Sequence, residues 1–213
     1  MDELSAEEVR VLGCLIEKEA TTPEQYPLTL NSLTLACNQA TNREPVVSYD
    51  QDVVTGALND LREKHLTRVL LPAHGRVTKY RQVLGEAWAL TGQELAVLAV
   101  MMLRGPQTLN ELKTRTERYE ADLDDMGGVE GVLERLAARP EPLVVLLGRQ
   151  PGQREDRYAQ LLGGPPDLER LNAAPAGPQP GRANRLDQLE EEVRRLRSEL
   201  DDLRVQLQDL LGP

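Results

Sequence analysis

Apolar side chains recur at intervals of three and four residues along the N-terminal part of the chain, a pattern that predicts short amphipathic helices. The first helix is expected to begin after Ser5, because Glu8 stands three residues further on and the two have the spacing of a capping box. Two more helices are predicted within residues 29–64, on either side of a turn that contains Pro45. Two short helices joined across such a turn form a helix-turn-helix.

The second helix of this motif carries the clearer pattern. Ser48 and Gln51 have the spacing of another capping box and predict its start. The polar positions between the apolar ones are expected to form its solvent-facing side. The positions expected to face the core recur at helical spacing, and they are Val53, Val54, Ala57, Leu58 and Leu61.

The pattern changes from helical to extended after residue 64. Residues 67–71 and 77–83 are rich in β-branched and aliphatic side chains, and residues 72–75, between them, contain Pro and Gly. Two extended runs joined by a Gly-containing turn predict a β-hairpin. Three helices followed by a hairpin are typical of a winged helix, whose wing is the hairpin.

The second half of the chain repeats this order of elements. Thr91 and Thr108 each stand three residues before a Glu, which predicts two further capping boxes. We therefore predict a duplicated domain: two tandem winged helices, at residues 1–86 and 87–163, in a mainly α fold with small β-hairpin wings, of class α+β. Four motifs recur in order, with only the loop lengths changed: residues 4–9 match 90–95, 28–33 match 107–112, 54–61 match 129–136, and Arg76, Lys79 and Tyr80 match Arg154, Arg157 and Tyr158.

The C-terminal part has a different pattern. Residues 164–184 are rich in Pro, Gly and Ala, which predicts a linker. Residues 185–211 then follow a heptad repeat, which predicts a coiled-coil helix. Its core positions are Leu186, Leu189, Val193, Leu196, Leu200, Leu203, Leu207 and Leu210.

The charges that flank the heptad core favour a parallel homodimer. An antiparallel pair would bring like charges together. Leucine at most core positions leaves the number of strands open, and a helix that folds back on its own domain is the alternative. In a parallel pair the facing residues all have opposite sign: Arg185 with Glu190, Glu192 with Arg197, and Glu199 with Arg204.

Composition narrows the function classes. The formal net charge is -10, which argues against a generic nucleic-acid coat. Phe is absent and Trp88 is the only Trp, so the core is expected to be aliphatic and base-stacking platforms are not expected. Cys14 and Cys37 lie in apolar helical patterns, which predicts buried, reduced thiols. Because no apolar run approaches the ~20 residues that span a bilayer and no signal-peptide pattern is present, we predict a cytoplasmic protein without a membrane partner.

The sequence lacks motifs for catalysis or metal binding. It contains no Gly-rich phosphate loop, no nucleophile elbow and no H-E-x-x-H. The two histidines, His65 and His74, are too few for a zinc site. Asp122, Asp124 and Asp125 lack the Gly and the closing Glu of a calcium loop, so they are expected to form a solvated loop that caps the next helix. We predict no enzyme, no metal and no cofactor.

Residues 65–90 form the basic segment of the chain, with four Lys or Arg and one Asp or Glu. A winged helix with a basic wing predicts a DNA-binding protein, in which Arg76, Lys79 and Arg81 contact phosphates. The main hypothesis is therefore a regulatory protein that binds double-stranded DNA and self-associates through its coiled coil. The side chains expected near base edges are Gln51, Thr55, Asn59 and Arg62.

Acidic side chains support an alternative hypothesis. Asp52 and Asp60 lie beside the predicted reading residues, and Glu130 and Glu134 lie on the equivalent helix of the second unit, where they would repel phosphates. These surfaces favour a non-enzymatic interaction scaffold with a protein partner. For the wing, an ordinary solvated hairpin is the alternative.

Residues 11–19 and 21–46 resemble the YceH family. The resemblance implies a bacterial protein with tandem winged-helix domains and no settled biochemical role, and it implies no catalytic residues. Capping and turn hydrogen bonds are one expected role for the polar residues of this signature, and ligand contacts are the other. These signature residues are Asn31, Asn38, Gln39, Asn42, Arg43 and Glu44.

Overall fold

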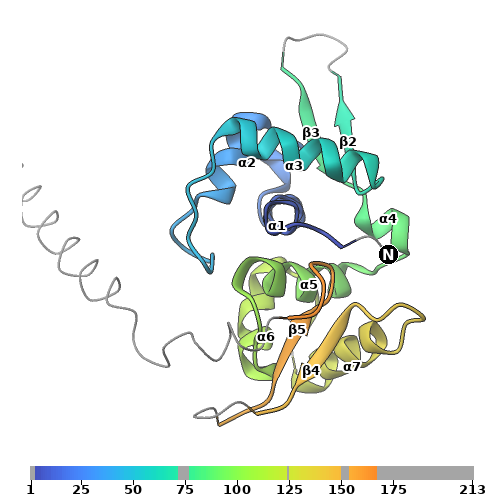
Figure 1. The fold of residues 1–213 in the computed structure, drawn as a ribbon. Coiled ribbons are helices and arrows are strands. Elements are labelled where there is room, and N and C mark those ends of the chain that lie inside the picture. Colours follow the sequence, from blue (N-terminus) through green and yellow to red (C-terminus); the bar gives the residue numbers. More distant parts are fainter. Residues whose placement is uncertain (1–2, 72–76, 124, 150–153, 167–213) are drawn as a thin grey trace, which may run out of the picture. The chain divides into compact units, whose positions relative to one another are not determined.

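A computed structural model describes residues 3–71, 77–123, 125–149 and 154–166, and these residues form a mixed α+β fold with small antiparallel sheets (Figure 1). The elements of the first half are α1 (Ala6–Thr21), the 3-10 turn η1 (Pro23–Gln25), β1 (Leu28–Thr29), α2 (Leu30–Cys37), α3 (Gln51–Glu63), β2 (Thr67–Leu70), β3 (Lys79–Gln82) and α4 (Leu84–Trp88). Those of the second half are α5 (Gly92–Arg104), α6 (Leu109–Thr116), the 3-10 turn η2 (Glu117–Tyr119), α7 (Met126–Ala137), β4 (Val144–Leu147) and β5 (Arg157–Gln160).

Three predicted capping boxes are confirmed. Ahead of α1, the backbone N–H of Ser5 donates to the Glu8 carboxylate at 2.7 Å, and the N–H of Glu8 donates to Ser5 Oγ at 3.2 Å. Thr91 and Thr108 cap α5 and α6 in the same reciprocal way. Each box satisfies two backbone N–H groups that the first helical turn leaves free, so the starts of these helices are set locally.

The capping box predicted between Ser48 and Gln51 is wrong. Helix α3 begins at Gln51, and its N-cap is Asp50, whose Oδ1 accepts from the N–H of Val53 at 2.9 Å. An Asp directly before the first helical turn is a favourable cap that also complements the helix dipole, and it takes the place of Ser48. Of the predicted apolar face, Val53 is exposed and the other four positions are buried.

The predicted hairpin is present as the antiparallel pair β2–β3, which runs upward in Figure 1. Strand β1 adds a third strand, in the order β1-β3-β2, and places Leu28 opposite Tyr80. In the second half, β4 and β5 pair as a hairpin, and a single bridge joins Gln107 to Tyr158. Leu28 and Gln107 occupy matched positions of the sequence repeat, as do the two tyrosines, so the repeat extends to the strand pairing.

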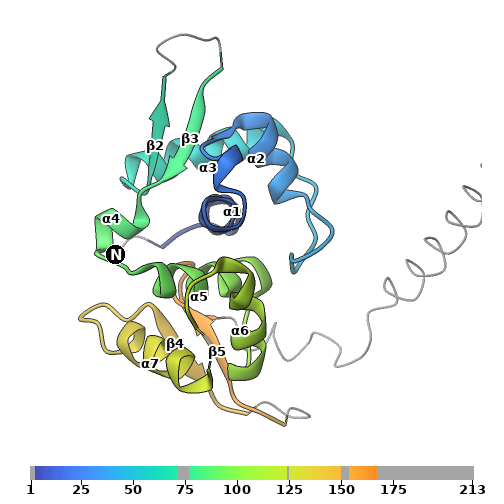
Figure 2. The same ribbon diagram turned by 180° about the vertical axis from the view of Figure 1, so that it is seen from behind.

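Helices α1 and α5 lie against each other, and both views show them side by side (Figures 1 and 2). Their backbones come close because Gly13 has no side chain: a Cβ there would lie 3.1 Å from Leu103 Cδ2 and from Met102 Cβ. Most buried apolar residues of both halves belong to one continuous core. The core therefore continues past residue 86, and the domain boundary predicted there stays a prediction.

Several predicted features lie outside the described residues. These are most of the linker, the whole heptad segment with its eight core positions, and Arg76 of the wing. Within the part of the chain that the structure does describe, both cysteines are free and buried, as predicted. No helix in that part is long and apolar enough to cross a membrane.

Candidate nucleic-acid interface

Helix α3 presents one continuous polar face to solvent. Its buried side carries Val54, Ala57, Leu58 and Leu61. Residues three and four apart share a helix face, so the predicted reading residues form one stripe on the other side. Within this stripe Gln51, Asn59 and Arg62 are exposed, while Thr55 is half-buried and donates its hydroxyl to the Gln51 carbonyl at 2.7 Å.

A glycine lies in the middle of this exposed face. A Cβ at Gly56 would have no neighbouring atom within 4 Å, so the packing gives no reason for a glycine here. A glycine inside a helix costs about 1 kcal/mol relative to alanine. The position leaves the α3 backbone open to close approach by another molecule, beside Asn59 three residues further on.

Carboxylates share the exposed surface of α3. Asp52, Asp60 and Glu63 are all exposed. Asp52 lies in the first turn, where a negative charge is favourable with the helix dipole. The same charges would repel phosphates, so α3 offers polar side chains of the kind that pair with bases but no net positive charge.

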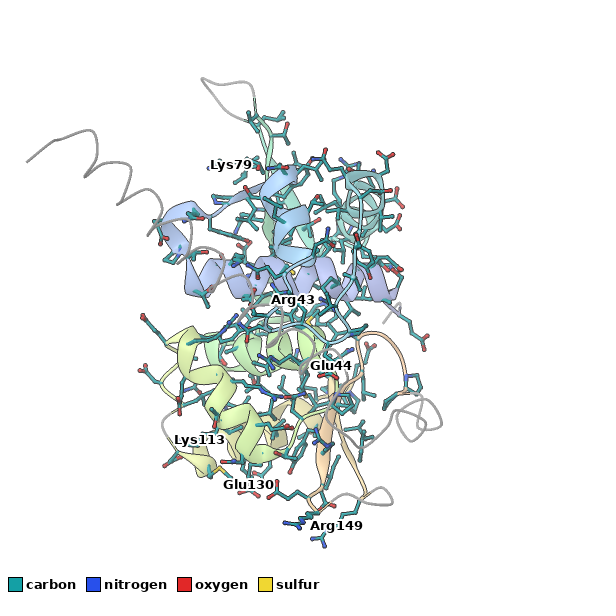
Figure 3. All side chains as sticks on the ribbon, turned by 90° about the vertical axis from the view of Figure 1, so that its left-hand side faces the viewer. Arg43, Glu44, Lys79, Lys113, Glu130 and Arg149 are labelled. Atoms are coloured by element: carbon teal, nitrogen blue, oxygen red, sulfur yellow. The ribbon has the colours of Figure 1, made fainter. Side chains whose placement is uncertain are left out.

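Positive charge gathers instead on the hairpin β2–β3, whose strand β2 contacts α3. The hairpin is tied to the helix at its base, where the hydroxyl of Thr67 donates to the Leu58 carbonyl at 3.4 Å. Arg68 and Arg81 lie opposite each other in the β2–β3 register. Lys79 is exposed on the same hairpin (Figure 3) and forms no ion pair with the described residues.

A carboxylate on α4 offsets part of this positive charge. The Glu86 carboxylate lies 2.7 Å from Arg81 Nη1 and 3.9 Å from Arg68 Nη2. The hydrogen bond from Arg81 holds the pKa of Glu86 below its usual range. Because Glu86 is exposed, this pair is weak and both arginines can exchange it for a phosphate.

Five of the six signature residues, all except Asn31, belong to the loop between α2 and α3. Asn38 closes this loop with two hydrogen bonds to Tyr49: its Nδ2 donates to the carbonyl at 2.7 Å, and its Oδ1 accepts from the backbone N–H at 2.8 Å. Asn42 has a left-handed backbone with a φ of 59°, which asparagine tolerates better than most residues. Asn38 therefore holds the loop that leads into α3 closed, and Asn42 supplies a left-handed turn within it.

Arg43 anchors the same loop in the core (Figure 3). Its side chain is fully buried and donates to both oxygens of the buried Glu17 carboxylate, at 2.9 and 2.5 Å. It also donates to the Ala36 carbonyl and to Gln39 Oε1, each at 3.0 Å. Burial lowers the pKa of Arg43, but the hydrogen bonds and charge of Glu17 more than offset this and raise it. Complete pairing makes a buried charge tolerable, so this contact fixes the loop in place.

The remaining signature residues differ in position. Asn31 is exposed on α2. The backbone N–H of Glu44 donates to the Leu103 carbonyl of α5 at 2.8 Å. The loop is therefore bound to α1 through Arg43 and to α5 through Glu44.

Sequence reasoning missed a group of arginines beside this loop. Arg104, Arg115 and Arg118 come from α5, α6 and η2, and they line a pocket of about 140 Å³ together with Glu17 and Asn42. No motif joins these positions. Basic residues near a helix C-terminus are also what the helix dipole favours, which hides any other role in the sequence.

The acidic loop caps the helix that follows it, as predicted. Asp125 caps α7, with its Oδ1 accepting from the N–H of Gly128 at 2.6 Å. Asp122 is exposed, and Asp124 lies outside the described residues. His65 directly follows the C-cap of α3. Among the described residues, no group of three His, Cys, Asp or Glu side chains could hold a metal ion.

Comparisons with known proteins place the chain among relatives whose names state no activity. The family described as "Protein of unknown function, DUF480" matches residues 4–153. A UPF0502 protein of Pelobacter propionicus is 50% identical over 214 residues, covering 98% of this chain and 97% of its own length. A UPF0502 protein of Geobacter sulfurreducens is 54% identical over 172 residues, covering 80% and 78%. One of Opitutus terrae is 48% identical over 186 residues, covering 87% and 80%. These matches confirm the predicted resemblance to a bacterial family of unknown function.

Proposed function

Since this chain belongs to the DUF480 family of proteins of unknown function, we propose a function from its own geometry: it binds double-stranded DNA through α3 and the hairpin β2–β3. In this proposal each half is a winged helix, and the first half is the DNA-binding one. Helix α3 enters the major groove, and the hairpin follows the phosphate backbone. The protein acts as a regulator rather than an enzyme.

One observation carries the proposal: α3, which exposes the polar stripe, contacts strand β2 of the basic hairpin. Gln51 and Asn59 are side chains that pair with adenine edges, and Arg62 pairs with guanine. Lys79 and Arg81 supply the phosphate contacts, which Arg76 extends in the sequence. In a chain with a net charge of -10, this concentration of positive charge selects one surface for an anionic partner.

The test measures binding of a labelled random-sequence duplex by fluorescence anisotropy at two salt concentrations. About three phosphate contacts, by Arg76, Lys79 and Arg81, give a loss of affinity on the order of 40-fold between ~50 and ~200 mM salt. The Lys79→Gln/Arg81→Gln double variant should bind more weakly and reduce the salt slope by about 2.

A matched control comes from the second hairpin. The Arg149→Gln/Arg154→Gln variant removes the same charge, and each double variant loses one exposed ion pair, Arg81–Glu86 or Arg149–Asp156. The control variant is expected to bind DNA as the unaltered protein does. Absence of binding at ~50 mM salt, or equal weakening by both double variants, would refute non-specific DNA binding at this surface.

Self-association is the second part of the proposal, and its support is the heptad pattern of the sequence. A parallel dimer would bring two copies of α3 to one duplex. Charged residues in a coiled-coil core prevent pairing, so Leu196→Lys with Leu203→Lys in the full chain should halve the mass seen in sedimentation equilibrium. Equal masses for the variant and the unaltered chain would refute the coiled-coil dimer.

A protein-interaction scaffold is the second candidate, and the surface of α7 favours it. This helix matches α3 in the repeat but exposes Glu130 and Glu134 where α3 carries Thr55 and Asn59. A partner with a basic surface would fit this face. Proteins that bind the unaltered chain in a pull-down, but do not bind the Glu130→Lys/Glu134→Lys variant, would support a scaffold role. Absence of DNA binding at low salt would make the scaffold the favoured function.

A further inference from the structure

We infer that the pocket lined by Arg104, Arg115 and Arg118 binds a small phosphate-bearing anion, a role that goes beyond the proposed DNA contact. The pocket has a volume of about 140 Å³ and lies at the meeting of α1, the Asn42 loop, α5, α6 and η2. Tyr119 and the apolar side chains Val100 and Leu103 complete its lining.

The charges around the pocket are not balanced. Glu17 is shared by the two arginines Arg43 and Arg118. Glu111 is likewise shared, since its carboxylate lies 3.5 Å from Arg115 Nη2 and 2.8 Å from Arg157 Nη1. Each carboxylate thus faces two guanidinium groups.

Arg104 donates a hydrogen bond to a neutral side chain. Its Nη2 donates to Asn42 Oδ1, the side chain that the left-handed turn of the loop presents. Burial lowers the pKa of Arg104, and the charges of Arg115 and Arg118 lower it further, while Glu44 acts in the opposite direction. The three pocket arginines therefore lie close enough to repel one another.

The count of charges gives the sign of the ligand. The five guanidinium groups of this cluster face three carboxylates, which leaves two positive charges. An anion that accepts from several guanidinium groups would relieve the repulsion between them. The carboxylates in the cluster are Glu17, Glu44 and Glu111, and the guanidinium groups are those of Arg43, Arg104, Arg115, Arg118 and Arg157.

The size and donor chemistry narrow the class of anion. Organic ligand pockets usually measure roughly 300 to 1,000 Å³, so this one suits inorganic phosphate or the terminal phosphate of a larger molecule. Guanidinium groups pair with phosphate through two parallel N–H bonds. The side chains of Arg115 and Arg118 are 30% and 37% exposed, so the ligand can reach them from solvent.

Isothermal titration calorimetry on the full chain tests the inference. The probes are sodium phosphate and glycerol 3-phosphate, each titrated at constant ionic strength set by sodium chloride. We expect saturable binding with one site per chain for at least one probe. Binding of both probes identifies the phosphate group itself as the ligand, whereas binding of only glycerol 3-phosphate identifies an organic phosphate.

The variants are chosen to keep the buried ion pair intact. Arg104→Gln and Arg115→Gln are made singly, so that a folding defect in one leaves the other informative, and thermal unfolding checks both. Each lost guanidinium contact should weaken binding about tenfold or more. The matched control is Arg149→Gln, an exposed arginine on the second hairpin that does not line the pocket and should bind as the unaltered chain does.

Three results would overturn the inference. One is the absence of saturable heat for both probes at millimolar concentration. Another is equal weakening in the Arg149→Gln control, which would show only general electrostatic attraction. The third is a loss of duplex affinity in the Arg104→Gln and Arg115→Gln variants as large as that in Lys79→Gln/Arg81→Gln, because these arginines would then serve the DNA backbone. Failure of DNA binding leaves the calorimetric result unaffected, so the two proposals fail separately.

Discussion

Replacing Gly56 by alanine separates the stability of α3 from its use as a contact surface. The added Cβ would meet no atom within 4 Å, and the residue lies in the interior of a thirteen-residue helix. The substitution therefore adds no clash and removes the helix-propensity cost of glycine, about 1 kcal/mol. For a chain of this size, that gain raises Tm by roughly 2 to 4 °C.

The assay combines urea denaturation with the anisotropy measurement. The midpoint should rise while the slope m stays constant, because the surface exposed on unfolding hardly changes. Duplex affinity should fall at the same time, since the new methyl group lies beside Asn59 on the face proposed to enter the groove. A more stable protein that binds less well is a combination that general damage to the fold cannot produce.

The equivalent glycine of the repeat provides the control. Gly131 lies inside α7, and a Cβ there would be 3.6 Å from Arg135 Nη1, an ordinary van der Waals distance. Gly131→Ala should stabilise the protein by a similar amount and leave duplex affinity unchanged. If Gly56→Ala destabilises the protein, the packing argument is refuted. If it stabilises the protein and leaves duplex affinity unchanged, this face of α3 does not contact DNA.

Two further substitutions test the charged contacts. Glu17→Gln leaves the Arg43 guanidinium buried without a counter-charge and should lower the free energy of unfolding by about 3 to 5 kcal/mol. The control Glu117→Gln removes an exposed ion pair and should lower it by less than about 1 kcal/mol. Equal losses for the two variants in urea denaturation would show that the buried ion pair does not hold the loop in place. Glu86→Gln releases Arg81 for phosphate and should tighten duplex binding and steepen its salt dependence, and weaker binding would exclude Arg81 from the contact.

Local chemistry explains which parts of the fold could be predicted. A capping box needs only two side chains three residues apart, so Ser5, Thr91 and Thr108 could be identified from the sequence alone. The prediction of where α3 starts was wrong because two residues able to cap it, Ser48 and Asp50, lie two positions apart. Asp50 directly precedes the first helical turn and is the cap. Such a choice depends on the path of the loop, which the Asn38 hydrogen bonds and the Arg43 ion pair determine.

Features that depend on distant residues were beyond the sequence. Strand β1 has two residues, too few to show a period, and it exists because β3 offers it a partner. The pocket arginines Arg104, Arg115 and Arg118 meet Asn42 only after α5 has packed against α1. The candidate DNA surface could be predicted more completely, because its stripe on α3 and its basic strands follow each other directly in the chain.

The position of positive charge on an acidic chain also bears on how the two proposals relate. Most of the surface of this acidic chain would repel a polyanion, except where basic side chains lie close together. The basic hairpin would therefore set the orientation in which the protein binds DNA. The arginine pocket is a second such place, but it is concave and small, and it is suited to a phosphate group rather than to a duplex. It also adjoins Asn42 and Glu17, which position the loop that leads into α3. An anion bound there would act on the same loop, so binding of phosphate and of duplex should each alter the affinity for the other by the same factor, which can be measured from either side.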